Sequence, residues 1–182
     1  MEGVVYLTLE QAKRIHEKTI QYSGGGTYEH FDLGRLDSVL HNIQNDDYYP
    51  TFEEKLSHLF FCVCEFHCFA DGNKRLAITL SAQFLLLNGY MAVAKNFFTV
   101  MENVSYQVAA GKINKPLLLR IITAVMDGTY DTDEELKIDI IHAIEWPTNS
   151  MFPLAAWQNA ARWPYRSSCG AFRLFCPPYS HG

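Results

Sequence analysis

Apolar residues recur at helical spacing through most of the first 145 residues, and polar residues fill the positions between them. The clearest apolar stripe runs from Phe52 to Phe66, so this segment is predicted to be a central amphipathic helix. Thr51 and Glu54 have the spacing of a capping box, which predicts where the helix begins. A second segment, 73–88, is apolar on nearly every side and is predicted to be a buried helix.

Cap signals and apolar spacing predict five further helices in the same part of the chain. They run approximately over residues 8–22, 33–43, 97–110, 115–127 and 132–145. The expected fold class is therefore all-α.

The segment before the central helix, "QNDDYYPTF", interrupts the helical pattern with turn-forming residues and Pro50. It is predicted to project as a short flap, either a hairpin or a loop. Tyr48, Tyr49 and Phe52 are candidate residues for docking a target protein. Ordinary packing of these aromatic rings is the alternative, and the sequence favours neither.

The composition changes after residue 145. The segment 146–182 holds five of the seven prolines and all three tryptophans, and it has no lysine or acidic residue. We therefore expect one folded domain over residues 1–145 and a Trp/Pro-rich tail over residues 146–182. The tail is either a non-native appendage, the interpretation that we favour, or a partner-binding segment with exposed aromatic side chains.

Charge and hydropathy narrow the possible partners. The formal net charge is −5, so the chain as a whole has no basic field, which argues against nucleic acid as a partner. No apolar run reaches the roughly 18 residues of a membrane span, and the first residues lack the pattern of a signal peptide. We expect a cytoplasmic protein with no membrane partner.

The cysteines do not favour a zinc site. Cys62 and Cys64 lie two residues apart on the predicted central helix, so their side chains point in different directions. Both are better interpreted as small buried hydrophobic residues. The odd total of five cysteines fits a reducing compartment.

The stretch "HCFADGNKR", residues 67–75, concentrates polar chemistry between the two central helices. The start of a helix offers unpaired N–H groups to an anion, and Gly72 lets the backbone come close to a phosphate. Asn73, Lys74 and Arg75 add an amide, an ammonium and a guanidinium. Together they predict a cradle for the phosphates of a nucleotide.

Two further residues of this stretch add reactivity to the predicted cradle. Asp71 is a hard oxygen ligand that suits Mg²⁺, and His67 can accept a hydroxyl proton near neutral pH. Taken singly, each residue has an ordinary explanation as a turn, cap or surface residue. Their joint spacing predicts transfer of a phosphate-containing group from a nucleotide to a hydroxyl.

The stretch "HCFADGNKRLA" resembles the signature of the Fic/Doc family, which usually reads His-x-Phe-x-Asp/Glu-Gly/Ala-Asn-Gly/Lys-Arg. The resemblance extends over about residues 6–127 and implies a Fic/Doc-type helical bundle, with a catalytic domain over residues 1–145. It would make His67 the general base, Phe69 a buried anchor of the loop, Asp71 the Mg²⁺ ligand, and Gly72, Asn73 and Arg75 phosphate binders.

Two positions differ from the Fic proteins that transfer nucleotidyl groups, which carry Gly where this chain has Lys74 and Arg where it has Ile78. In both, the chain resembles the Doc branch, described as kinases that pass the γ-phosphate to a threonine of elongation factor Tu. The resemblance therefore implies a toxin-type protein kinase that uses Mg²⁺ with ATP or another nucleoside triphosphate. The alternatives are nucleotidyl transfer (AMPylation) to a protein hydroxyl and a nucleotide-binding pseudoenzyme.

Regulation is expected to come from a second protein. Self-inhibited Fic proteins resemble one another in a helix with the pattern Ser/Thr-x-x-x-Glu-Gly/Asn, and this sequence has no such pattern. "TVMEN", from Thr99 to Asn103, comes nearest but is one residue short. We therefore expect a cognate antitoxin that binds a groove beside the loop.

Overall fold

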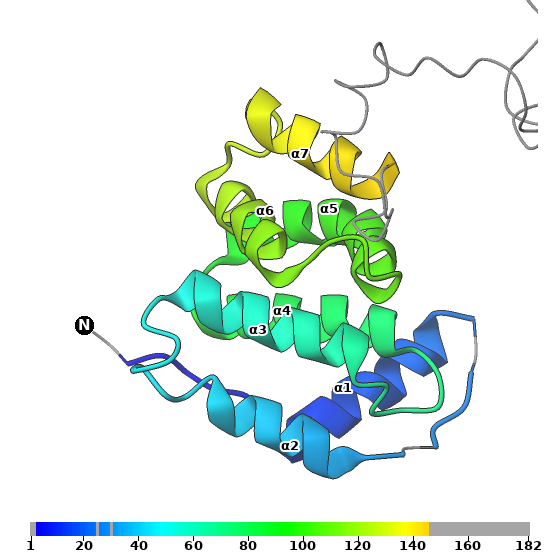
Figure 1. Ribbon diagram of the computed structural model, residues 1–182. Helices are drawn as coiled ribbons and strands as arrows, with labels where there is room; N and C mark the ends of the chain where they lie inside the picture. Colours follow the sequence, from blue (N-terminus) through cyan, green and yellow to red (C-terminus); the bar gives the residue numbers. More distant parts are fainter. Residues whose placement is uncertain (1–2, 25, 30, 146–182) are drawn as a thin grey trace, which may run out of the picture. The chain divides into compact units, whose positions relative to one another are not determined.

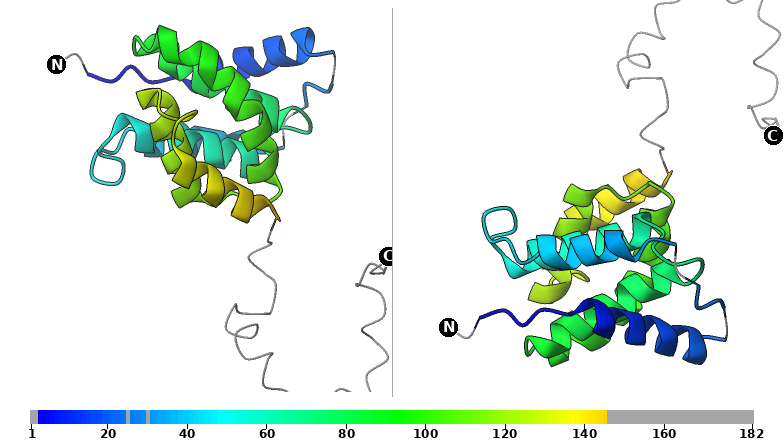
Figure 2. Two further views of the ribbon diagram at one scale, coloured as in Figure 1. Left: turned by 90° about the horizontal axis from the view of Figure 1, so that it is seen from above. Right: turned by 90° about the horizontal axis from the view of Figure 1, so that it is seen from below.

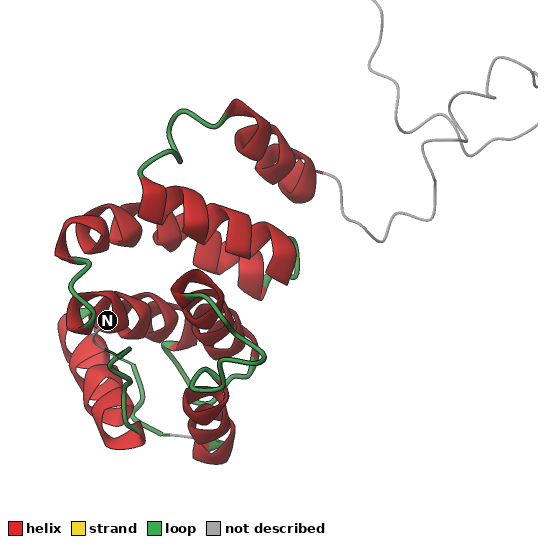
Figure 3. Cartoon of the chain, turned by 90° about the vertical axis from the view of Figure 1, so that its left-hand side faces the viewer, coloured by secondary structure: helices red, strands yellow, loops and turns green. Residues whose placement is uncertain are grey.

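The computed structural model describes residues 3–24, 26–29 and 31–145, so both interpretations of the tail 146–182 lie outside the described residues. The described chain forms seven α-helices and no strand (Figures 1 and 3), which confirms the all-α prediction. The helices are α1 (Leu9–Tyr22), α2 (Leu33–Asn42), α3 (Phe52–Glu65), α4 (Asn73–Leu87), α5 (Met91–Ala109), α6 (Lys115–Asp127) and α7 (Glu134–Glu145).

The centre of the domain is built from α3 and α4. Helix α4 packs against α1, α3 and α5, and α3 packs also against α6. Both helices carry side chains that are fully removed from solvent, among them Phe60 of α3 and Phe84 of α4. Burial of rings of this size is the main stabilising contribution to such a core. None of the described helices is long and apolar enough to cross a bilayer.

Local capping chemistry fixes the start of α3 as predicted. The Thr51 side chain accepts from the Glu54 N–H, and the Glu54 carboxylate accepts from the Thr51 N–H in return. Each bond satisfies a backbone donor that the first turn of a helix leaves unpaired.

The prediction for α5 was wrong at its start. This helix begins at Met91 rather than at residue 97, immediately after the turn at Gly89. Buried Ala94 and Phe97 share one face of a single helix, so the apolar period already begins in its first turn.

The segment between α2 and α3 consists of turns and contains no strand. Lys55 holds it onto α3, because its buried Nζ donates to the Ile43 carbonyl at 2.9 Å and to Asp46 Oδ1 at 2.6 Å. The segment projects at the N-terminal end of α3, whereas the loop from His67 to Gly72 lies at the C-terminal end (Figure 2). Fourteen helical residues separate these ends by about 20 Å.

Candidate active site

His67 stands on a backbone that is unusual for its residue type. Its φ is +46°, and it is the one non-glycine residue with positive φ in the described chain. An L-residue in this conformation costs roughly 1 kcal/mol. The chain turns sharply here after Phe66, the C-cap of α3, and the His67 side chain is exposed to solvent. None of the described residues bonds to its imidazole, so both ring nitrogens can form hydrogen bonds with a ligand.

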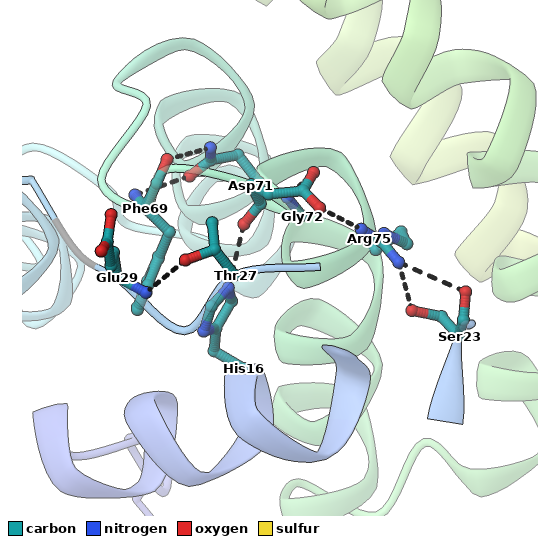
Figure 4. A network of polar contacts seen from close by, with 9 residues as sticks. His16, Ser23, Thr27, Glu29, Phe69, Asp71, Gly72 and Arg75 are labelled. Atoms are coloured by element: carbon teal, nitrogen blue, oxygen red, sulfur yellow. Dashed lines mark hydrogen bonds and ion pairs between the residues drawn. The ribbon is translucent and has the colours of Figure 1, made fainter. Parts of the chain in front are cut away.

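Asn73 closes the loop that follows. Its Oδ1 accepts from the Phe69 N–H at 3.0 Å, and its Nδ2 donates to the Phe69 carbonyl at 2.7 Å (Figure 4). The Asn73 side chain is buried, so these bonds are not exchanged with water. We expected its amide to contact a phosphate, but the structure uses both ends of the amide to shape the loop.

His16 of α1 supports the loop from below. Its ring stacks on the Phe69 ring with centroids 3.7 Å apart, and its Nε2 lies 3.0 Å from the Asp71 carbonyl (Figure 4). His16 is buried, and burial lowers the pKa of its imidazole. The neutral ring therefore donates from Nε2 to Asp71. Sequence analysis missed this residue, although its spacing with buried Ala12 and Ile20 places it on the inner face of α1.

The segment before α2 runs beside the loop and pairs with its backbone. The Ala70 N–H donates to the Glu29 carbonyl at 3.0 Å, and the Cys68 carbonyl accepts from the Phe31 and Asp32 N–H groups at 2.9 and 3.2 Å. The loop is thus held both by His16 of α1 and by Glu29, Phe31 and Asp32. Sequence analysis missed this partner because backbone pairing leaves no residue pattern.

Asp71, Arg75 and Ser23 form the polar surface of the site. Asp71 Oδ1 accepts from the Gly72 N–H at 2.6 Å, and its Oδ2 accepts from Arg75 Nη2 at 3.0 Å. Arg75 Nη1 also donates to Ser23 Oγ, next to the end of α1 (Figure 4). The carboxylate is 47% exposed and the guanidinium side chain 34%, so both remain accessible to a ligand.

Two glycines allow the chain to pack closely around Asp71. A Cβ on Gly26 would lie 2.4 Å from Asp71 Oδ2, which no real structure tolerates. Gly72 has a φ of +80°, and a Cβ there would lie 2.7 Å from Ile20 Cδ1. We expected Gly72 to make room for a phosphate, and the structure shows in addition that it makes room for α1.

The first N–H groups of α4 complete the cradle. The first bond of the helix runs from the Leu76 N–H to the Gly72 carbonyl, so the N–H groups of Asn73, Lys74 and Arg75 have no partner within the helix. Gly72 is the N-cap and supplies no side-chain acceptor. This end of α4 therefore presents the partial positive charge that attracts anions.

Lys74 leans away from the loop. Its exposed ammonium lies 5.3 Å from the ring centroid of Tyr106 on α5, a cation–π contact. Ile78, one turn further along α4, is buried in the core. Neither side chain contributes a hydrogen-bonding group to the loop itself.

Five of the predicted site residues lie on the loop after α3 and the first turn of α4: His67, Asp71, Gly72, Asn73 and Arg75. The structure does not bring the candidate docking residues to them. Tyr49 packs its ring on His58, and Phe52 stacks on Phe84 at 4.8 Å, both at the other end of α3. Tyr48 is 77% exposed in the same turn segment.

The residues fit a magnesium ion that arrives with a nucleotide. Mg²⁺ takes one or two carboxylates together with substrate phosphates, and Asp71 offers one partly exposed carboxylate beside the cradle. A zinc site is absent from the described residues, which contain no cluster of three metal-ligating side chains. Cys62 and Cys64 are buried, and burial raises the pKa of their thiols to about 11 and about 12, as expected for inert hydrophobic residues.

Comparison with known families agrees with this geometry. The model of the Fic/DOC family matches residues 6–85, a stretch that contains α1 to α3, the loop and most of α4. No curated protein matches the chain. The match supports a Fic-type transferase in general terms.

Proposed function

We propose that the chain is a Fic-type protein kinase, which moves the γ-phosphoryl group of Mg²⁺-ATP to a Thr or Ser hydroxyl of another protein. The observation that carries the proposal is that His67, exposed and without a bonding partner among the described residues, lies on the loop that leads into an anion cradle at the start of α4. This transfer needs a base whose nitrogens are not already engaged, next to several groups that donate hydrogen bonds to phosphate.

Each residue has a defined part in the reaction. His67 accepts the proton of the acceptor hydroxyl while that oxygen forms a bond to the γ-phosphorus. The bond from the γ-phosphorus to the bridging oxygen breaks, and the nucleoside diphosphate leaves with that oxygen. Arg75 and the first N–H groups of α4 bind the phosphate charge, and Asp71 would hold Mg²⁺, which neutralises charge on the phosphate oxygens.

Lys74 and Ile78 support γ- over α-phosphate transfer. The orientation of the nucleotide decides which phosphorus faces His67. The buried Ile78 offers no donor that could anchor a terminal phosphate deeper along α4, as the reverse orientation would require. Lys74 replaces the glycine that leaves an open hole for the α-phosphate in the Fic proteins that transfer nucleotidyl groups. A bound phosphate would draw its ammonium from the Tyr106 ring toward the cradle.

The acceptor protein is proposed to dock on Thr27, Tyr28, Glu29 and Phe31, which line an open hollow of the surface. Glu29 and Phe31 bond the loop backbone, and Tyr28 and Phe31 are 56% and 73% exposed. Tyr48, in contrast, precedes the other end of α3, and the helix between the two ends is about 20 Å long. The first acceptor to test is elongation factor Tu, which the resemblance to the Doc branch suggests.

Labelled nucleotides test the proposal directly. Purified chain, elongation factor Tu and Mg²⁺ are incubated with ATP labelled at the α- or at the γ-phosphate, with His67→Ala as the control. We expect γ-label on the acceptor and none with the variant. Label from α-labelled and not from γ-labelled ATP would make the chain an AMPylating enzyme, and no label with any protein tested would favour a pseudoenzyme.

Control by a second protein is also proposed. None of the described helices carries the inhibitory pattern Ser/Thr-x-x-x-Glu-Gly/Asn. Active chain expressed alone should therefore arrest growth, and co-expression of a cognate antitoxin should restore it. Harmless accumulation of active protein at high level would overturn this expectation.

A further inference from the structure

A second cavity opens between the turn segment before α3 and the start of α6. Its volume is about 310 Å³, at the lower end of the range for small-molecule sites. Polar side chains from three parts of the chain meet in it, namely Tyr49, His58 of α3 and Lys115 of α6. The cavity lies toward the N-terminal end of α3, and the function proposed above makes no use of it.

His58 is the centre of this cluster, and more hydrogen-bond donors lie near its ring nitrogen than that nitrogen can accept from. Its Nδ1 lies 2.9 Å from Tyr49 Oη and 2.8 Å from Lys115 Nζ. A neutral imidazole nitrogen has one lone pair and accepts from one donor at a time. Whichever group donates to Nδ1, the hydrogen-bonding capacity of the other is left for a third partner.

The positive charge of Lys115 adds further hydrogen-bond donors to this cluster. His58 is 8% exposed, and burial together with Lys115 lowers the pKa of its imidazole to about 4, so the ring is neutral at pH 7. Lys115 brings an ammonium with three donors, and among the described residues no carboxylate lies within 4.0 Å of it. The cluster therefore has a positive charge and unused donors but few acceptors.

The walls of the cavity are mainly apolar. The apolar part of the lining comes from the rings of Tyr48 and Tyr49, from Pro116, and from Leu119 one turn further along α6. Lys115 Nζ lies 6.0 Å from the ring centroid of Tyr49. Glu54 is the one carboxylate of the lining, and the capping box of α3 engages it through Thr51. A ligand that fits must place oxygen acceptors at Lys115 and Tyr49 and a flat apolar body against these walls.

We infer that this cavity binds a small organic oxyanion with a planar apolar body, either a carboxylate or a phosphate ester. Its oxygens would accept from Lys115 Nζ and Tyr49 Oη, the two donors that compete for His58 Nδ1. A charge-assisted hydrogen bond of this kind contributes about 1.5 to 3 kcal/mol, which is about ten- to a hundredfold in affinity.

The test uses the full-length chain and three probes, benzoate, phenyl phosphate and inorganic phosphate. Binding is measured by calorimetry, and ¹³C-labelled histidine reports whether the His58 ring shifts on binding. The variants are Lys115→Met, Tyr49→Phe and Glu54→Gln, with Lys95→Met, an exposed lysine of α5, as the matched control. Thermal melting shows that each variant is folded.

We expect benzoate or phenyl phosphate to bind with a shift of the His58 signal, and to bind more tightly than inorganic phosphate. Lys115→Met should weaken binding at least tenfold and Tyr49→Phe by a smaller factor, while Lys95→Met should leave it unchanged. Glu54→Gln keeps the capping box and removes a negative charge that repels the anionic probe, so it should tighten binding. Preference for benzoate or for phenyl phosphate distinguishes the two oxyanions. Absence of a His58 shift with every probe, or equal affinity in Lys115→Met, would overturn the inference.

Discussion

Two histidines in and beside α3 have opposite environments. His67, in the loop that follows α3, is exposed and has no bonding partner in the described chain, while the backbone around it is held by neighbouring groups. His58, in the middle of α3, is buried, and its ring is engaged by Tyr49 and Lys115. The first histidine is positioned by the main chain and the second by side chains.

The difference distinguishes a histidine that is free to react from one that stabilises the fold. In the proposed reaction the general base must be free to bind the acceptor proton, so the position of His67 has to come from the loop and not from bonds to its own ring. Asn73, His16, Glu29, Phe31 and Asp32 hold the backbone of that loop. A histidine whose ring is already bonded contributes to stability instead, and the predictions below separate these two contributions.

The largest expected effect is the loss of transfer in His67→Ala. General-base catalysis contributes about 10² to 10⁴ in rate, so the labelled-ATP assay should fall by this factor while the free energy of unfolding barely changes. His41→Ala, at an exposed histidine of α2, is the matched control and should keep full activity.

Glycine at position 67 sharpens this test. Because the φ of residue 67 is +46°, His67→Gly should be more stable than His67→Ala by about 1 kcal/mol and equally inactive. Urea unfolding of the two variants measures this difference. Equal activity of His67→Ala and the unaltered chain would remove His67 from the reaction.

Asn73→Ala should affect both stability and activity. It removes two hydrogen bonds to the Phe69 backbone and leaves a buried N–H and carbonyl unpaired. Each unpaired group costs roughly 1 to 3 kcal/mol, so urea unfolding should show a loss of about 2 to 6 kcal/mol. Asn88→Ala, at another helix-end asparagine of α4 that bonds the Val5 backbone, controls for the loss of an amide outside the loop. If Asn73→Ala is as stable as the parent, the loop keeps its conformation without the hydrogen bonds of Asn73.

Acid should destabilise the domain through His58. The pKa of this imidazole falls from 6.5 to about 4 on folding, so the folded state binds fewer protons than the unfolded state. The resulting stability is present above about pH 6.5 and is lost as the pH falls toward 4, with about 2 kcal/mol lost at pH 5. Urea unfolding at pH 7 and pH 5 should show a smaller loss in His58→Gln, whose side chain does not titrate, and unchanged γ-label transfer at pH 7. The same loss in both proteins would exclude His58 as its source.

Much of the fold could be predicted from neighbouring residues because its causes are local. The capping box of Thr51 and Glu54 is confirmed, and so is the buried, apolar character of α4. These signals lie within a few residues of the structure that they specify. The start of α5 was missed because Gly89 ends one helix and leaves the next almost no connecting segment.

The parts of the site that could not be predicted depend on contacts between residues far apart in the chain. His16 bonds Asp71, and Lys115 bonds His58, in both cases more than fifty residues away. Neither contact has a spacing rule, since it follows from how the helices pack. The roles given to the motif residues stay predictions. The packing of the helices, which the motif does not specify, adds that Asn73 bonds the loop backbone and that Tyr49 packs on His58.

The smallest expected effect concerns Lys74, which links the candidate active site to α5. Its ammonium lies over the ring of Tyr106, an exposed residue, and such a contact contributes about 0.5 to 1 kcal/mol. A phosphate must draw the ammonium from this ring, so Tyr106→Leu should lower the KM for ATP by about two- to fivefold without changing kcat. Lys74→Met should raise the KM, because the cradle loses a cation, and Phe98→Leu, an exposed aromatic of the same helix, should have no effect. Initial rates over a range of ATP concentrations measure all three variants. A higher KM in Tyr106→Leu would mean that the ring positions Lys74 for the nucleotide. Tyr106 would then be part of the candidate active site.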